Sequence, residues 1–159
     1  MDDELKIRPI EAAHVGDLIH IGEATKLSPW SAESYLDELK NPNAVMLRLV
    51  ADGNQTIGFV VGRFVPGEGE SVDAEIYNIA IKEAEQRCGR GQILFDAFAA
   101  ECSERHVSNI WLEVRESNDK AISFYERNGF ERVQTRKAFY ADPPEHALLM
   151  RLELTKNAP

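Results

Sequence analysis

The stretch Tyr77–Phe98, YNIAIKEAEQRCGRGQILFDAF, joins a β-rich run, a glycine-containing loop and the start of an amphipathic helix. Gly89 and Gly91 remove side chains where the chain turns, which leaves successive backbone N–H groups exposed at the first turn of the helix. A helix N-terminus carries about half a positive charge and binds phosphate groups readily. Since Arg87 and Arg90 add full positive charges, the loop is predicted to hold a pyrophosphate.

The glycine spacing argues against two other phosphate-binding motifs. A dinucleotide-binding fold needs G-x-G-x-x-G at the opening of a βαβ unit, whereas Leu94 stands at the third glycine position and several strand-like runs come first. A Walker loop needs Gly-Lys-Ser/Thr, which does not follow here. The pyrophosphate is therefore expected in a different kind of fold.

The remaining sequence is typical of one domain, residues 1–159, of the α/β or α+β class. Strands are expected at residues 4–10, 44–51, 56–65, 72–81, 108–115, 130–140 and 146–154, and helices at 11–25, 31–39, 90–106 and 118–128. In the first helix, Val15, Leu18, Ile19 and Gly22 are predicted to share the buried face. Asp52-Gly53-Asn54 indicates a hairpin turn, Ser31 is the expected N-cap of the second helix, and Ser117-Asn118 offers a cap for the last helix.

Composition and charge narrow the classes of partner. The chain has 43% apolar and 28% charged residues, as soluble proteins do, and it opens on an acidic segment without a signal-peptide pattern. The longest apolar run is too short to cross a bilayer, so a cytoplasmic protein without a membrane partner is expected. A net charge of −9 argues against nucleic acid. The same charge suits a cationic substrate, and it equally suits plain solubility.

Cysteine and histidine give no sign of a metal site. Cys88 and Cys102 form no CxxC pair, and the histidines lack the paired spacing that a structural zinc site requires. The sequence therefore predicts no metal.

A carboxylate lies in the middle of the predicted strand at residues 108–115. Alternation places Leu112 and Val114 on one face and Glu113 and Arg115 on the other. A carboxylate there is costly to bury unless it is paired or has a task. From the strand alone, Glu113 is expected to pair with Arg115 or with a neighbouring strand, and Tyr125 in the next helix is expected to be a core aromatic.

Two blocks resemble one known family. QRCGRG at residues 86–91 fits the Q/R-x-x-G-x-G/A acetyl-CoA motif of the GNAT acetyltransferases. WLEVRESNDKAISFYERNGF at residues 111–130 resembles the RimI branch, the N-terminal alanine acetyltransferases of small-subunit ribosomal proteins. SPWS, NIAI, TRKAFY and EHALLM agree in order along nearly the whole chain. The resemblance implies a single mixed, mostly antiparallel sheet of six to seven strands with about four helices on its faces.

The resemblance implies acetyl-CoA as co-substrate. Ile79, Ala80 and Ile81 would pair with the pantetheine arm as an added strand does, and Asn118 would hydrogen-bond near the thioester. The pyrophosphate would be held by the loop residues Arg87, Cys88, Gly89, Arg90, Gly91 and Gln92. The thiol of Cys88 faces an anion there and is expected to take no part in the chemistry.

The resemblance also assigns catalytic roles. Glu113 corresponds to the general base and Tyr125 to the general acid of direct acetyl transfer, which needs no covalent enzyme intermediate. Trp30, Glu75 and Tyr140 fall on the substrate side, where Glu75 is a candidate to assist the base.

The implied acceptor is the N-terminal amine of a protein, possibly a ribosomal one. Two alternatives stay open: a small amine such as a polyamine, amino sugar or antibiotic, and a non-catalytic acetyl-CoA-binding module. Ala138 and His146 depart from the residues that relatives often carry, Asn and an acid, so they bear on the choice of acceptor.

Overall fold

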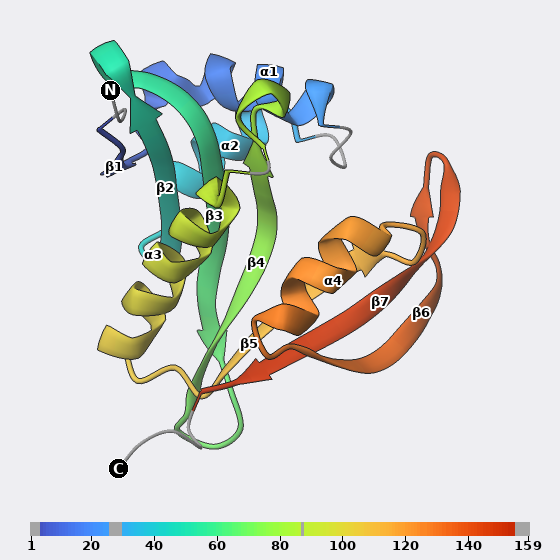
Figure 1. Cartoon of the computed structure of the whole chain (residues 1–159). Helices are drawn as coiled ribbons and strands as arrows, with labels where there is room; N and C mark the ends of the chain where they lie inside the picture. Colours follow the sequence, from blue (N-terminus) through green and yellow to red (C-terminus); the bar gives the residue numbers. More distant parts are fainter. Residues whose placement is uncertain (1–3, 26–29, 87, 155–159) are drawn as a thin grey trace. The chain divides into compact units, whose positions relative to one another are not determined.

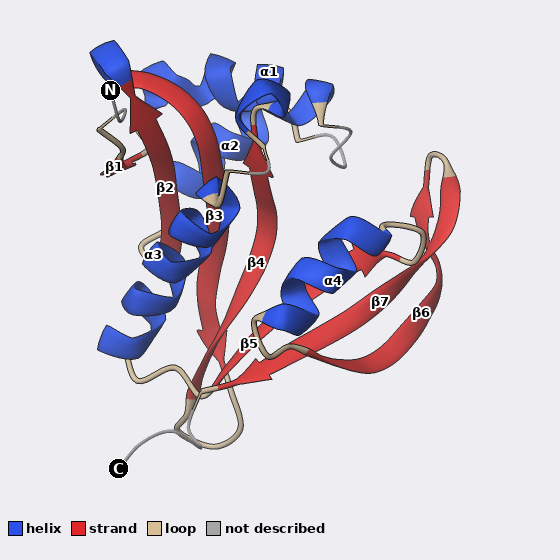
Figure 2. Cartoon of the chain, viewed as in Figure 1, coloured by secondary structure: helices blue, strands red, loops and turns tan. Residues whose placement is uncertain are grey.

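The computed structural model describes residues 4–25, 30–86 and 88–154 (Figures 1 and 2). Within these ranges the strands are β1 Lys6–Pro9, β2 Ala44–Ala51, β3 Gln55–Pro66, β4 Val72–Ile81, β5 Asn109–Arg115, β6 Glu131–Ala141 and β7 Pro144–Glu153. The α-helices are α1 Val15–Ala24, α2 Ala32–Leu39, α3 Arg90–Glu104 and α4 Asp119–Arg127, and short 3-10 turns are η1 Ala12–His14, η2 Asp52–Asn54 and η3 Glu83–Glu85.

The strands form one seven-stranded sheet in the order β1-β2-β3-β4-β5-β7-β6. The β1–β2, β2–β3, β5–β7 and β6–β7 ladders are antiparallel, and β4–β5 is parallel. This confirms the expected mixed, mostly antiparallel sheet. The parallel ladder is short, with pairs from Ala74–Ile110 to Ile76–Leu112, and β4 continues beyond it to Ile81.

The chain divides into two compact units. The first comprises residues 1–63 and 77–104, and the second comprises residues 64–76 and 105–159. Both β3 and β4 contribute residues to each unit. No described helix is long and apolar enough to cross a membrane.

In the first unit, α3 lies on one side of β2 and β3, and α1 and α2 lie on the other (Figure 1). The core under α1 and α2 contains Leu18, Ile21 and Phe59. The predicted face of α1 was wrong at one position, because Ile21 is buried whereas Ile19 is only partly so. Ile19 and Ile21 lie on opposite sides of the stripe formed by Val15, Leu18 and Gly22, and the core buries the side that carries Ile21. α1 also begins later than expected, at Val15 after the η1 turn.

Local signals account for the ends of these elements. The Ser31 hydroxyl accepts a hydrogen bond from the Ser34 N–H at 3.0 Å, which confirms the predicted N-cap of α2. Gly53 and Asn54 both have a φ of 68° in the turn between β2 and β3. Since glycine and asparagine tolerate this left-handed conformation best, the predicted hairpin forms there.

In the second unit, α4 covers one face of β5 and β7 (Figure 1). Leu112 and Val114 are buried on alternate positions of β5, opposite Met150 and Leu148 of β7. The other face of β5 carries the half-buried Trp111, Glu113 and Arg115. This confirms the predicted alternation, and it separates the polar side chains of β5 from its apolar core face.

The strand β6 is the outer edge of the sheet and is exposed along nearly its whole length. Its ladder with β7 is irregular at two places, between Arg132 and Gln134 and between Arg136 and Tyr140. Ala138, in the second irregularity, has a φ of 53°, and its N–H donates to His146 Nδ1 at 2.8 Å. The two residues that depart from the family pattern thus contact each other.

Candidate active site

The loop predicted to hold the pyrophosphate of the acetyl donor, residues 86–92, belongs to the first unit, and we call it the donor loop. Gln86 Nε2 donates to the Ile81 carbonyl at 3.0 Å, which ties the loop to the end of β4. Gly89 has a φ of 74°, and a Cβ added there would meet no atom of the described residues within 4 Å. The loop backbone is therefore uncovered immediately before α3 begins at Arg90, where helical N–H groups are available to an anion. This fits a pyrophosphate.

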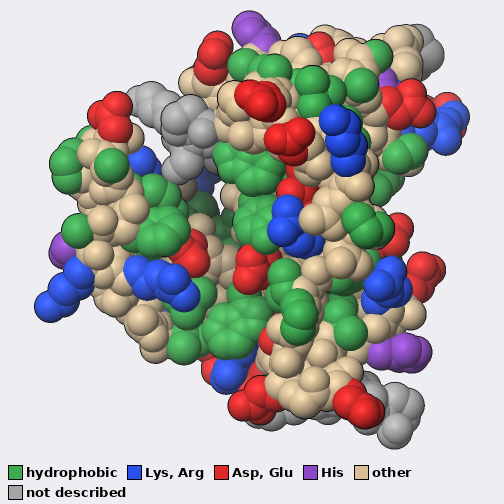
Figure 3. All heavy atoms as spheres, turned by 180° about the vertical axis from the view of Figure 1, so that it is seen from behind, with side chains coloured by type: hydrophobic (Ala, Val, Ile, Leu, Met, Phe, Trp, Pro, Cys, Tyr) green, Lys and Arg blue, Asp and Glu red, His purple; other side chains and the backbone are tan. Residues whose placement is uncertain are grey.

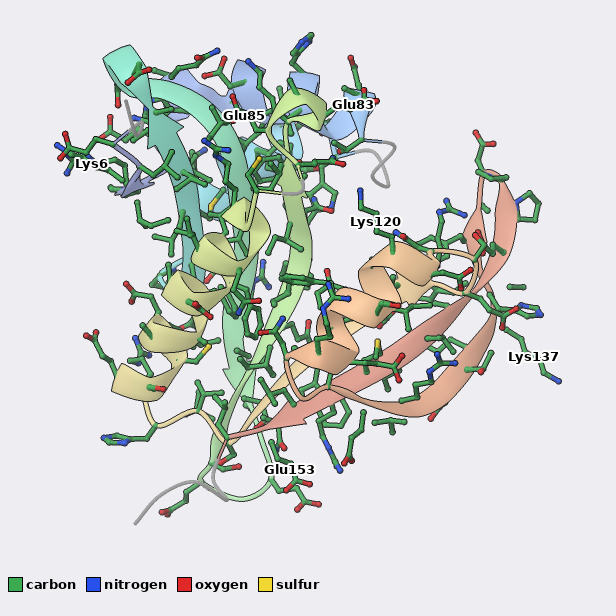
Figure 4. All side chains as sticks on the ribbon, viewed as in Figure 1. Lys6, Glu83, Glu85, Lys120, Lys137 and Glu153 are labelled. Carbon is green, nitrogen blue, oxygen red and sulfur yellow. The ribbon has the colours of Figure 1, made fainter. Side chains whose placement is uncertain are left out.

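The charges of the donor loop are partly engaged within the protein. Arg90 Nη1 lies 3.2 Å from Glu85 Oε2, so this arginine offsets the charge of an acidic neighbour. Figure 4 labels Glu83 and Glu85 at the η3 turn that precedes the loop. Gln92 Nε2 donates to Asp96 Oδ1 at 2.8 Å. Arg87 lies outside the described residues.

Close packing supports the strand that leads into the loop. Ala80 and Ile81 are buried and Ile79 is partly so. A Cβ at Gly58 of β3 would lie 2.4 Å from Ile81 Cδ1 and 2.9 Å from the Ala80 carbonyl oxygen. Gly58 therefore permits close packing of β3 on β4, a role that the sequence analysis missed because it depends on the neighbouring strand.

The second unit contains four electrostatically linked side chains that are the candidates for proton transfer and for contact with the acceptor. We call them the acid–base cluster: Glu75, Glu113, Tyr125 and Tyr140. Glu113 is 26% exposed, and its Oε1 lies 3.7 Å from Arg136 Nη1. Its Oε2 is buried and has no hydrogen-bond partner among the described residues. The expected partner was wrong, because the pairing cation comes from β6, with β7 in between, and not from Arg115 or an adjacent strand.

The surroundings of Glu113 favour its protonated form. Burial raises the pKa of the Glu113 carboxyl above its ordinary value, Arg136 opposes this rise, and Glu75 adds to it. Glu75 lies on β4 in register with Trp111 of β5. A carboxylate with a raised pKa accepts a proton more readily, as a general base must.

Tyr125 is buried in the second unit, as expected of a core aromatic. It is 7% exposed and packs edge to face on Phe130, with ring centroids 5.5 Å apart. Burial, and secondarily Tyr140, raises the pKa of the Tyr125 phenol. Tyr125 is thus a core aromatic whose hydroxyl stays protonated at neutral pH, as a proton donor requires.

Tyr140 is held by an ionic network around the β6–β7 turn. The Arg115 guanidinium stacks on the Tyr140 ring at 4.1 Å and lies 3.4 Å from Glu145 Oε1. Glu145 Oε2 accepts from the Ser117 N–H at 2.6 Å, and hydrogen bonds to Ser117 hold the pKa of Glu145 below its ordinary value. Burial, followed by Glu113, raises the pKa of the Tyr140 phenol. Arg115 therefore positions Tyr140.

Trp30 lies in an aromatic cluster of the first unit. Its ring centroid is 5.1 Å from that of Tyr35 and 5.9 Å from that of Tyr77. Burial raises the pKa of Tyr35 to about 12, and Asn78 Nδ2 donates to its hydroxyl at 3.4 Å. Arg63 lies over Tyr77 at 5.8 Å. Sequence reasoning missed Tyr35 and Tyr77, since only packing brings them beside Trp30.

Asn118 has a structural task. Its side chain accepts from the Ala121 N–H at 3.2 Å as the N-cap of α4, which confirms the predicted cap. Cys88 is exposed, and its thiol lies 3.6 Å from the Gln86 carbonyl oxygen. Within the described ranges, no three His, Cys, Asp or Glu side chains are grouped so as to hold a metal ion.

Comparison with known proteins identifies the family. The acetyltransferase (GNAT) family model matches residues 16–130. A ribosomal protein bS18 alanine N-acetyltransferase of Haemophilus influenzae is 36% identical over 147 residues, covering 91% of this chain and 95% of that protein. The crystal structure of the Escherichia coli ribosomal-protein-S18-alanine N-acetyltransferase has a TM-score of 0.83 and 27% identity, covering 98% and 99% of the two chains.

A third similarity concerns the fold alone. Arabidopsis thaliana NAA60 in complex with acetyl-CoA has a TM-score of 0.85 at 19% identity, covering 96% of this chain and 99% of that one. The family model spans most of the sequence, and the relative from Haemophilus influenzae is similar over nearly its whole length. This chain therefore belongs to the GNAT acetyltransferase family and is an N-acetyltransferase of the RimI type.

Proposed function

We propose that this enzyme transfers an acetyl group from acetyl-CoA to the N-terminal alanine of ribosomal protein bS18. The names of its relatives support this acceptor. The observation that carries the proposal is the half-buried Glu113 carboxylate, in which one oxygen is loosely paired and the other is buried with no hydrogen-bond partner in the described part of the chain. Such a carboxylate has room for a further donor, and an ammonium group offers three.

An α-amine suits this base better than a lysine side chain does. Only the neutral amine attacks a thioester. Losing the proton at pH 7 costs about 1 kcal/mol for an α-amine and about 4–5 kcal/mol for lysine. Glu113 accepts the proton, directly or through water, and its raised pKa assists this.

Transfer then needs one bond formed and one broken. The amine nitrogen bonds to the thioester carbonyl carbon, the carbon–sulfur bond breaks, and the departing thiolate takes a proton. The nitrogen releases its surplus proton to give the neutral amide, and this proton restores the group that protonated the thiolate. We assign the protonation of the thiolate to the Tyr125 hydroxyl, which the buried ring on α4 holds in place. Tyr140 and Trp30 are assigned to the acceptor, and Glu75 assists Glu113 through its negative charge.

The donor loop and the end of β4 are assigned to the co-substrate. Arg90, Gly91 and Gln92 begin α3 and would present N–H groups to the pyrophosphate, beside Arg87, Cys88 and Gly89. The segment Ile79–Ile81 lies beyond the last β4–β5 pair, so its backbone can receive the pantetheine arm as a strand edge would. Asn118 would contact acetyl-CoA near the thioester while its side chain continues to cap α4.

Two broader expectations remain part of this proposal. Residues 1–159 form one acetyltransferase domain, since a single sheet takes strands from both units. The enzyme works in the cytoplasm, where ribosomal proteins are made. On the face drawn in Figure 3, acidic and basic side chains are interspersed, with no single basic field such as nucleic acid would require.

A small-amine acceptor is the second candidate. The observation that favours it is the contact between Ala138 and His146, which gives the β6–β7 turn residues other than those that relatives often carry. Both candidates use Glu113 in the same way, so only a comparison of acceptors separates them.

The test is acetylation of matched peptides. The purified enzyme is incubated with acetyl-CoA and three acceptors: the bS18 N-terminal peptide, the same peptide with a blocked N-terminus and an internal lysine, and spermidine. We expect thiol release with the first peptide alone, and mass spectrometry should place the acetyl group on the alanine nitrogen. Faster turnover of spermidine would favour the small-amine function, and no turnover with any amine would favour a non-catalytic module.

A further inference from the structure

The ion pair that Glu113 makes is loose. Arg136 Nη1 lies 3.7 Å from Glu113 Oε1, whereas arginine and carboxylate form paired hydrogen bonds at about 2.7–2.9 Å where both are free to align. The Arg136 side chain is 45% exposed, and Glu113 Oε2 is not used by any described donor. The carboxylate is therefore partly neutralised but not saturated.

Arg136 lies on the edge strand β6, next to a place where the pairing with β7 is irregular. The ladder between β6 and β7 is regular only from the pair Gln134–Leu149 to the pair Arg136–Ala147, and it shifts before the next pair, Tyr140–Glu145. Among the strands that the structure describes, none pairs with the other side of β6. Figure 4 shows Lys137, the next residue, pointing away from the sheet. The Arg136 side chain can leave Glu113 without breaking a packed core.

An acceptor amine and Arg136 need the same carboxylate. An N-terminal ammonium that approaches Glu113 would meet the positive charge of Arg136, and two cations on one carboxylate repel each other. The ammonium is the smaller group and carries three rotating donors, which suits both carboxylate oxygens. Binding of the charged acceptor is thus expected to move Arg136 aside.

We propose that Arg136 is the resident counter-ion of Glu113 and that the acceptor ammonium displaces it, so that Arg136 tunes acceptor affinity and the acid limb of the pH profile. This rests on the proposed function. In the second unit, the charges that act on Glu113 are those of Glu75 on β4 and Arg136 on β6. Tyr140 on β6 interacts with Glu113 and is itself paired with Arg115, and β7 places the neutral Leu149 opposite Glu113.

Removal of the Arg136 charge is expected to lower kcat/KM on the acid limb of the pH profile and to improve acceptor binding at higher pH. Arg136 favours the charged form of Glu113, so its loss raises the Glu113 pKa further and moves the acid limb of kcat/KM to higher pH. We expect a shift of about 0.2–0.7 pH unit, the range of a partly exposed ion pair. At pH values above that limb, the variant has no Arg136 guanidinium to compete with the acceptor for the Glu113 carboxylate, so KM for the acceptor should fall by about twofold to fivefold.

The experiment compares Arg136→Gln with Arg136→Lys and Lys137→Gln. Arg136→Lys keeps the charge and should return the limb towards the wild type. Lys137→Gln removes a charge from the neighbouring residue and should leave the limb in place. An acceptor KM that is unchanged or higher in Arg136→Gln, with a limb equal to that of Lys137→Gln, would overturn the proposal.

A second readout needs no acceptor. Carbon-13 NMR of the Glu113 carboxyl in the free enzyme should give a higher titration midpoint in Arg136→Gln than in the wild type. An unshifted midpoint beside normal turnover would refute the counter-ion while the proposed function stands. Absence of turnover with every peptide would refute the function and the displacement, and the midpoint would still decide the pairing.

Discussion

The donor loop and the acid–base cluster are built in different ways. The donor loop consists of one continuous segment in which a left-handed Gly89 and the start of α3 offer backbone groups to an anion. The acid–base cluster collects side chains from β4, β5, α4 and β6, which lie far apart in the sequence. An anion site of the kind proposed for the donor loop can thus be encoded locally, whereas the surroundings of Glu113 depend on cross-strand partners such as Arg136.

Glu113→Gln should show the largest effect that separates the acid–base cluster from the donor loop. The amide keeps the shape of the side chain but cannot accept the proton, so kcat should fall by about 10²–10⁴-fold. Binding of CoA should be unchanged, because the donor loop is intact. Steady-state thiol release gives kcat, and calorimetry gives the CoA affinity. A kcat within threefold of the wild type would remove Glu113 from the mechanism.

Tyr125→Phe should have the next largest effect. The ring keeps its contact with Phe130, and only the phenol is lost. Because a thiolate with a pKa near 8.5 leaves easily, we expect a loss of about 10²-fold in kcat, at the lower end of acid catalysis. Urea denaturation should show stability close to that of the wild type. If kcat is retained, Tyr125 is a core aromatic only.

Gly89→Ala tests the other region. Alanine at a φ of 74° costs about 1–2 kcal/mol, so the empty loop is expected to relax to another conformation. CoA must then restore the left-handed turn, and its binding should weaken by about 5–30-fold. The value of kcat at saturating donor should stay within a few-fold. Gly16→Ala is the matched control, since this helical glycine also has open space around it, and it should leave CoA binding unchanged. Equal CoA affinity in both variants would contradict the account of the loop.

Ala138→Gly should have the smallest effect. Ala138 has a φ of 53°, a conformation that glycine adopts without the steric cost, so we expect a gain of about 0.5–1 kcal/mol in the free energy of unfolding. Ala100→Gly, at an exposed position of α3, is the matched control. Because glycine is unfavourable inside a helix, it should lower the free energy of unfolding by about 1 kcal/mol. Destabilisation by both would show that the turn gains nothing from glycine.

The same comparison explains what could be predicted from the sequence. Hydrophobic periodicity, the Ser31 cap and the turn at Asp52–Asn54 are local signals, and the elements that they predicted are present. Gly89 was recognised for the same reason. The exact start of α1 was missed, because the η1 turn depends on capping contacts around Glu11 and His14.

Long-range partners could not be predicted in this way. The pairing of Glu113 with Arg136 depends on the register of β7 with both β5 and β6, and on the shifted ladder next to Arg136. The packing of Gly58 on Ile81 and of Trp30 on Tyr35 likewise needs the neighbouring elements. Such contacts are properties of the sheet, and residue spacing alone does not contain them.

The central claim is that donor binding and proton transfer belong to separate regions, and one double-variant measurement tests it most directly. CoA affinity and kcat are measured for the wild type, Glu113→Gln, Gly89→Ala and the double variant. We predict that Glu113→Gln changes only kcat, that Gly89→Ala changes only CoA affinity, and that the double variant combines both losses additively. Weakening of CoA binding by Glu113→Gln as large as that by Gly89→Ala would contradict it.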